Sequence, residues 1–134
     1  MAEPTLSRSI EIRAARRSDV PAIVALLADD PLGQAREQNS EPLPESYFQA
    51  FEEIADQRGN WLLVAVSAGR VVGCLQLTLI PGLTRRGMKR GQIEGVRVAA
   101  EQRGRGIGEQ LIQHAIDMAR AEGCGLVKIG RAHV

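Results

Sequence analysis

The sequence predicts an α+β fold with a mixed, mostly antiparallel sheet and the element order β-α-α-β-β-β-α-β. Two β-rich runs, 61–67 and 71–80, have between them an Ala68-Gly69 dipeptide typical of a tight hairpin turn. A third run at 92–98 leads through a short polar loop into a long amphipathic helix at 106–122. A further strand begins at 124–127, so one strand–helix–strand crossover follows an antiparallel meander.

The first half of the chain adds one strand and two helices. Apolar and charged residues alternate over 10–14, which predicts a short strand. Ser18 stands where a helix N-cap is expected, and an apolar stripe with helical spacing over 20–27 predicts the helix that follows. Residues 33–44 are polar and contain two prolines, which predicts a loop. A second helix, with most of the aromatic residues on or beside it, is expected over 45–58.

Length and composition set the class of protein. The 134 residues fit a single domain with one modest core, and a 44% apolar content argues against disorder throughout the chain. No apolar run is long enough for a membrane span, and the N-terminus lacks the apolar core of a signal peptide. Cys74 and Cys124 have neither zinc-site nor disulfide-framework spacing. The sequence therefore predicts a cytoplasmic protein with no membrane partner and no metal site, and it allows a homodimer.

Charge is unevenly distributed along the chain. Residues 29–56 carry eight acids and one base, whereas residues 85–105 carry seven bases and two acids. Most such runs are solvated faces. Here the basic stretch surrounds a glycine-rich turn, which favours an anionic ligand. Nucleic acid is the weakest candidate partner, because no aromatic residue that could stack on a base lies among those arginines.

The glycine-rich turn opens the long helix. Its sequence is Arg103-Gly104-Arg105-Gly106-Ile107-Gly108. A helix N-terminus presents unpaired backbone N–H groups and the positive end of the helix dipole, and glycines let phosphate oxygens approach that backbone. A Walker loop would need Gly-Lys-Ser/Thr, and the Rossmann pattern would need glycine in place of Glu109 and a position after the first strand. The turn is therefore expected to bind a diphosphate in another way.

This segment resembles motif A of the GNAT acetyltransferases, R/Q-x-x-G-x-G/A, which Arg103, Gly106 and Gly108 match. The V-x-V sequence at 96–98 and the order of the elements are similar to that family as well, and the resemblance covers about residues 8–127. It implies a sheet of the acyl-CoA N-acyltransferase (GNAT) type. It also implies an N-acetyltransferase that moves an acetyl group from acetyl-CoA to a primary amine of a small molecule.

The resemblance further implies which residues bind acetyl-CoA. The backbone at the helix start would bind the pyrophosphate, and the strand before it would pair with the pantetheine arm like an added β-strand. A main-chain N–H of that strand would polarise the thioester carbonyl. The implied residues are Val96, Arg97, Val98, Arg103, Gly104, Arg105, Gly106, Ile107, Gly108 and Glu109.

Acyl transfer to an amine needs a neutral nucleophile, so a proton must leave before or during attack. Glu94 is the candidate catalytic base, because many relatives place a carboxylate at this position of the strand. The alternative is that Glu94 only pairs with Arg85, Arg86 or Arg97. His114 is expected to be a surface residue of the helix. The acidic segment 29–56 lies where the family builds its acceptor site, and a negative rim would favour a cationic amine.

A complete family member would add a helix and two strands after the strand at 124–127, and that helix commonly carries a tyrosine that protonates the leaving thiolate. The chain is therefore expected to be one incomplete N-acetyltransferase domain over 1–134, lacking the final α-β-β, poorly stable and inactive as written. Its last six residues, IGRAHV, match the translation of a common sequencing-adapter read. Residues 128–134 are accordingly expected to be a non-native tail, with a native strand as the alternative.

Two functions stay open. The first is acetyl-CoA-dependent N-acetylation, with aminoalkylphosphonates, aminoglycosides, polyamines and amino-acid-like amines as candidate acceptors. The second is a non-catalytic GNAT-like module that binds acetyl-CoA as a sensor. Release of thiol in the presence of a panel of amines would separate them.

Overall fold

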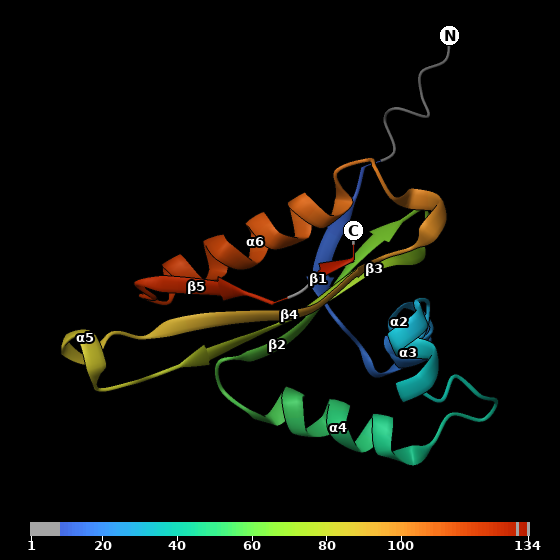
Figure 1. Ribbon diagram of the computed structural model, residues 1–134, viewed down its shortest axis with the longest axis horizontal. Coiled ribbons are helices and arrows are strands. Elements are labelled where there is room, and N and C mark those ends of the chain that lie inside the picture. Colours follow the sequence, from blue (N-terminus) through green and yellow to red (C-terminus); the bar gives the residue numbers. More distant parts are fainter. Residues whose placement is uncertain (1–8, 131, 134) are drawn as a thin grey trace, which may run out of the picture.

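The computed structural model describes residues 9–130 and 132–133, which form one twisted sheet with helices on both faces (Figure 1). The strand order is β1-β2-β3-β4-β5, and β6 also pairs with β4. Strands β1 to β4 pair with one another in antiparallel order, whereas β5 and β6 run parallel to β4. The predicted mixed, mostly antiparallel α+β fold is therefore confirmed.

The strands are β1 (Glu11–Ala14), β2 (Asn60–Ser67), β3 (Arg70–Ile80), β4 (Arg90–Val98), β5 (Leu126–Ile129) and β6 (Ala132–His133). The helices are α2 (Val20–Leu27), α3 (Pro31–Arg36), α4 (Glu45–Asp56), α5 (Thr84–Gly87) and α6 (Ile107–Ala121), with two 3-10 turns, η1 (Arg17–Asp19) and η2 (Ala100–Gln102). Helix α6 covers one face of the sheet, and α2, α3 and α4 lie on the other (Figure 1). We call these the α6 face and the α2 face. No helix in the described part of the chain is both long and apolar enough to span a membrane.

Two local predictions in the first half are wrong. Helix α3 begins at Pro31 and extends into the segment 33–44 that the polar composition predicted to be a loop, because the Asp30 side chain accepts a hydrogen bond from the Gly33 N–H at 2.6 Å and caps the helix. The N-cap position of α2 is Asp19, not Ser18, and the Asp19 side chain makes no capping hydrogen bond to α2. Its carboxylate accepts a hydrogen bond from the Arg16 N–H at 2.7 Å and so fixes the η1 turn.

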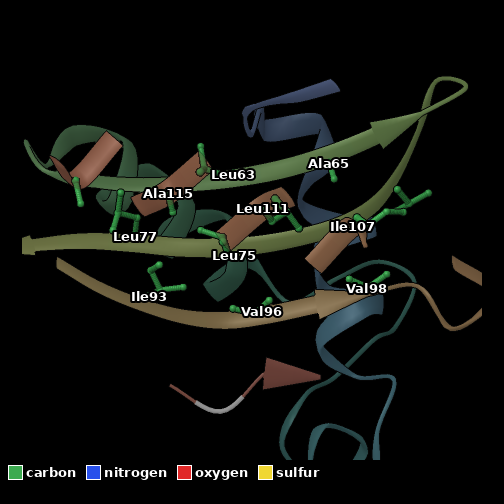
Figure 2. Packing of buried hydrophobic residues seen from close by; sticks show 12 residues of the cluster. Leu63, Ala65, Leu75, Leu77, Ile93, Val96, Val98, Ile107, Leu111 and Ala115 are labelled. Carbon is green, nitrogen blue, oxygen red and sulfur yellow. The ribbon is translucent and has the colours of Figure 1, made fainter. Parts of the chain in front are cut away.

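The main core lies between the sheet and α6 (Figure 2). Leu111, Ala115 and Ala119 of α6 are fully buried, and they pack on strand residues that include Leu75 and Leu77. These positions have the helical and the alternating spacing that the sequence predicted. Each buried leucine stabilises the fold by roughly 1.5–3 kcal/mol, so this face supplies most of the apolar stabilisation.

A smaller cluster lies on the α2 face. Ile23 and Leu26 of α2 pack there against Val64 of β2 and Cys74 of β3. The apolar character of this face does not continue along β3, because the next residue on the same side is Gln76. The α2 face is therefore mixed, and its polar part adjoins the strand that carries the candidate base.

A β-bulge interrupts β4 in the middle. Cys74 and Gln76, two residues apart in β3, lie opposite Arg97 and Glu94, which are three residues apart in β4. The extra residue is accommodated at Gly95, whose φ of +66° is rare for any residue with a side chain. Because of the bulge, Glu94 and Arg97 both point to the α2 face instead of opposite faces.

The end of the described chain lies along β4. Residues 126–129 pair with 90–93, so β5 extends two residues past the predicted 127. Residues 132 and 133 then pair with 96 and 97. Arg131 and Val134 of the predicted tail lie outside the described residues. That residues 128–134 are non-native, and that the domain is incomplete, stay predictions.

Candidate functional site

A cavity of about 240 Å³ lies at the N-terminus of α6. Its lining residues are Val98, Gln102, Arg103, Gly104, Gly106, Ile107, Gly108 and Glu109. All of them except Gln102 belong to the set that the family resemblance implied. Gln102 was missed because it lies in the η2 turn before the motif, where no periodicity or motif position marks it.

The wall of this cavity is formed by backbone that has no partner inside the helix. Gly106 is the N-cap residue of α6, with a φ of +82° that glycine adopts without strain. The first hydrogen bond of the helix runs from the Gln110 N–H to the Gly106 carbonyl at 3.0 Å. The amides of residues 107–109 precede that bond, so none of them has an acceptor within the helix. This end of the helix therefore favours a negatively charged ligand.

Arg103 is anchored beside the cavity but keeps part of its charge accessible. Its Nε donates a hydrogen bond to the Val98 carbonyl at 3.1 Å, and its Nη2 lies 3.8 Å from the Asp29 carboxylate. The Arg103 and Asp29 side chains are 38% and 53% exposed, so this ion pair is weak and screened by water. A phosphate could compete for the same Nη2. Arg105, in contrast, is exposed and does not line the cavity.

Arg97 lies in a different environment from the one expected of a cofactor ligand. Its side chain is only 9% exposed, and its Nε lies 3.2 Å from Oδ2 of the Asp30 carboxylate, itself 8% exposed. Its Nη1 donates a hydrogen bond to the Val96 carbonyl at 3.0 Å. The Arg97 side chain thus joins β4 to the start of α3. Only the backbone of Arg97 would therefore be available to contact a cofactor.

The edge of β4 that was expected to bind pantetheine is paired with the chain itself. Val96 and Arg97 pair in parallel with residues 132 and 133 of β6. The Val96 and Val98 carbonyls also accept hydrogen bonds from the two arginines described above, although each carbonyl has a second lone pair. A pantetheine arm at this edge would have to take the place of β6.

Glu94 is exposed and lies on the α2 face of β4. Its neighbour across the sheet is Gln76 of β3. Pairing of Glu94 with an arginine was the structural alternative to a catalytic role. Arg97 pairs with Asp30 instead, and among the described residues no ion pair joins Glu94 to Arg85 or Arg86. Glu94 therefore has the exposure that a proton acceptor for an incoming substrate needs.

The histidine of α6 and the two cysteines lie outside the cavity at the start of α6. His114 is exposed on α6, as expected. Both cysteines are free thiols, and burial raises the pKa of Cys74 to about 12, so Cys74 stays a thiol at neutral pH and cannot act as a nucleophile. Burial also raises the pKa of Cys124. Within residues 9–130 and 132–133, no three His, Cys, Asp or Glu side chains lie together in a way that could hold a metal ion.

Comparison with known proteins gives the family. Residues 21–133 match the sequence model of the acetyltransferase (GNAT) family. Glucosamine 6-phosphate N-acetyltransferase 1 of Oryza sativa subsp. japonica is 38% identical over 89 residues, which cover 63% of this chain and 54% of that protein. Glucosamine 6-phosphate N-acetyltransferase of Trypanosoma brucei brucei is 41% identical over 56 residues, which cover 42% of this chain and 38% of that protein. The chain thus spans about half, or less, of the length of these curated relatives.

The fold agrees with the family match. The crystal structure of a transcriptional regulator from Bacillus halodurans C-125 is similar with a TM-score of 0.89 and 44% identity, over 92% of this chain and 82% of that one. The family model matches most of the chain, and it includes the glycine turn at the start of α6 and the strand that carries Glu94. The resemblance read from the motif is therefore confirmed: this chain belongs to the acetyltransferase (GNAT) family.

Proposed function

We propose that this chain is an acetyl-CoA-dependent N-acetyltransferase that acts on the primary amine of a small molecule. The observation that carries the proposal is the cavity at the start of α6, whose wall consists of the backbone amides of residues 107–109 and the anchored Arg103. Acetyl-CoA is the co-substrate of the family. The curated relatives are named for glucosamine 6-phosphate, so a phosphorylated amino sugar comes first among the acceptors to be tested.

The residues of the cavity bind the diphosphate of the co-substrate. The unpaired amides at the helix start donate hydrogen bonds to the phosphate oxygens, and the helix dipole adds to their attraction. Arg103 keeps its Nε on the Val98 carbonyl and turns Nη2 from Asp29 to a phosphate oxygen. The diphosphate is thereby fixed at the C-terminal end of β4, and the acyl end of the ligand is directed along that strand toward Glu94.

Glu94 removes the proton that the acceptor amine must lose. The amine nitrogen attacks the thioester carbonyl, the C–N bond forms, and the C–S bond breaks to release the thiolate of CoA. One proton passes from the nitrogen to the Glu94 carboxylate, and the thiolate takes its proton from water. A backbone N–H of β4 donates to the carbonyl oxygen on which negative charge develops.

Gly106→Val tests the diphosphate site. A side chain at this position is strained by the positive φ and crowds the amides that bind the anion, so the Kd for CoA should rise by at least about 10-fold. Isothermal titration calorimetry measures the change. Gly123→Val is the matched control, because Gly123 has a φ of +86° at the other end of α6, outside the cavity. The control should lose similar thermal stability and keep its CoA affinity. Equal affinity of the two variants for CoA would refute the proposed site.

A second candidate function, binding of acetyl-CoA without turnover, is favoured by the position of β6. Residues 132 and 133 occupy the edge of β4 that the acyl arm would use, and a ligand held only through its diphosphate would not present the thioester to an amine. Thiol release with a panel of amines that includes glucosamine 6-phosphate, 2-aminoethylphosphonate and spermidine separates the two functions. Turnover of any of these amines supports the enzyme, and CoA binding without thiol release supports the binding module.

A further inference from the structure

A set of polar side chains crosses two strands, β2 and β3, on the α2 face, next to Glu94 of β4. Asn60 of β2 lies opposite Thr78 of β3, and Gln76 of β3 lies opposite Glu94 of β4. Residues directly opposite each other in antiparallel strands have their side chains on the same face and about 5 Å apart at Cβ. Asn60, Gln76 and Thr78, which we call the amide cluster, therefore share a surface with the candidate base.

The amide cluster adjoins the part of the α2 face that is apolar and buried. One pair of residues further along the same strands, Val64 and Cys74 are buried under α2. The three residues of the cluster are half-buried and connected to one another. Half-buried amides need such partners, since an unpaired amide in this position would destabilise the fold by about 1–3 kcal/mol.

The hydrogen bonds of the cluster fix the orientation of Gln76. Asn60 Oδ1 accepts from Gln76 Nε2 at 3.0 Å and from Thr78 Oγ1 at 3.3 Å. Asn60 Nδ2 in turn donates to Gln57 Oε1 at 2.9 Å, which holds the Asn60 amide in place. The Gln76 NH2 group is thereby engaged on the side of β2, so the Gln76 group left to accept a hydrogen bond is its carbonyl oxygen Oε1. Glu94 lies directly opposite Gln76 on the other neighbouring strand, β4.

Two hydrogen-bond acceptors, Gln76 Oε1 and the Glu94 carboxylate, are thus carried by residues that lie opposite each other on adjacent strands. A neutral primary amine has two N–H bonds and one lone pair. If each acceptor takes one N–H, the lone pair is left for attack on the thioester. A neutral secondary amine has a single N–H, so it would leave one of the two acceptors without a donor.

We propose that Gln76 is an acceptor-binding residue that makes the enzyme selective for primary amines, and that Asn60 is the positioning residue that orients it. This inference rests on the proposed N-acetyltransferase function. In the reaction the N–H bound to Glu94 loses its proton to the carboxylate. The N–H bound to Gln76 is retained and becomes the N–H of the product amide.

The test compares a primary amine with its N-methyl analogue, glucosamine 6-phosphate and N-methylglucosamine 6-phosphate, by thiol release at saturating acetyl-CoA. A site built to accept a substrate N–H rejects the analogue that lacks it, so the wild type should prefer the primary amine by at least about 100-fold in kcat/KM. Gln76→Leu should lower kcat/KM for the primary amine by about 10-fold or more and for the N-methyl amine by less than about 3-fold. The KM for acetyl-CoA should stay within about 2-fold.

Variants of Asn60 test whether this residue orients the Gln76 side chain or only stabilises the fold. Asn60→Asp keeps an oxygen that accepts from both Gln76 and Thr78, so it should retain most of the preference for the primary amine. Asn60→Leu removes that oxygen and should lose the preference in the same way as Gln76→Leu. Thr78→Val is the matched control, because it removes the other hydrogen bond to Asn60 and leaves the one from Gln76 intact. Its effect on the preference should be less than about 3-fold.

Each result has a defined meaning. If Gln76→Leu lowers kcat/KM equally for both amines, or changes neither, the role of Gln76 is refuted while the N-acetyltransferase function stands. If Asn60→Asp loses the preference as fully as Asn60→Leu, the positioning role of Asn60 is refuted. If the wild type releases no thiol with either amine or with the wider amine panel, both this inference and the proposed function fail. Melting temperatures of all variants show whether a loss reflects unfolding.

Discussion

The two faces of the sheet use the same strands for different purposes. On the α6 face, Leu75, Leu77 and Ile93 alternate along β3 and β4 and are closed over by Leu111 (Figure 2). On the α2 face, other positions of the same strands hold Gln76 and Thr78 of the amide cluster, Glu94 and Arg97. Apolar contacts need no directional partner, whereas each polar group near the α2 face requires one. The α6 face therefore supplies stability, and the α2 face retains the groups that can contact a substrate.

The buried ion pair between Arg97 and Asp30 is the feature of the α2 face whose disruption should destabilise the fold most. Asp30→Asn keeps an oxygen that can cap α3 but removes the charge, which leaves the buried Arg97 guanidinium uncompensated. We expect a loss of roughly 4 kcal/mol in the free energy of unfolding, measured by urea denaturation. Asp29→Asn, the same change at the neighbouring exposed pair, should cost less than about 1 kcal/mol.

The double variant Asp30→Asn with Arg97→Met tests whether the ion pair itself stabilises the fold. Removing both charges together should restore most of the stability, since a buried ion pair contributes little net stabilisation relative to neutral residues of similar volume. If the double variant remains as unstable as Asp30→Asn alone, the ion pair is a net source of stability, and the contrast between the two faces is wrong.

On the α6 face the largest loss in the free energy of unfolding should come from a substitution that leaves a cavity in the core. Leu111 has no exposed surface, so Leu111→Ala should lower the free energy of unfolding by roughly 3 kcal/mol through lost apolar contact and residual cavity volume. Ile112→Ala, on the half-buried side of the same helix turn, should cost less than half as much. Affinity for CoA, measured on the folded protein, should be unchanged in both. A loss of CoA affinity in Leu111→Ala would show that the two faces are not independent.

The Arg13–Asp19 pair gives the α2 face a pH dependence. The hydrogen bond from Arg13, 2.8 Å long, lowers the pKa of Asp19 below its ordinary value of 3.8, with partial burial acting in the opposite direction and the Arg16 N–H adding to the effect. Because the folded-state pKa is the lower one, the stabilisation is complete above about pH 4 and is lost as the pH falls through the folded-state value. Asp19→Asn should therefore cost roughly 2 kcal/mol at about pH 6 and less at about pH 2.

Urea denaturation at both pH values measures that difference. Glu52→Gln, which removes an exposed ion pair with Arg17, should change the free energy of unfolding by less than about 1 kcal/mol at either pH. A cost of Asp19→Asn that does not diminish in acid would mean that the residue acts through packing and not through its charge.

Part of the site could be predicted from the sequence because most of its residues are neighbours along the chain. The turn from Arg103 to Glu109 lies within one stretch of chain, and glycine spacing at a helix start has a direct physical meaning. The cavity duly contains most of these residues. Helix α3 was missed for the complementary reason: six residues are too few for a periodic signal, and its start depends on a single side-chain cap from Asp30.

By itself the sequence determined the order of strands β1 to β5 and of helices α2, α4 and α6, the apolar stripe of α6 and the glycine turn in front of it. Periodicity and backbone preference suffice for these features because they act over a few residues. Only the tertiary structure decided that Arg97 pairs with Asp30, that Gln76 stands beside Glu94, and that β6 lies along β4. These neighbours come from distant segments, and their contacts follow from strand register and the bulge at Gly95. A shift of one residue in that register would turn Glu94 to the opposite face, so the chemistry of the site depends on long-range packing.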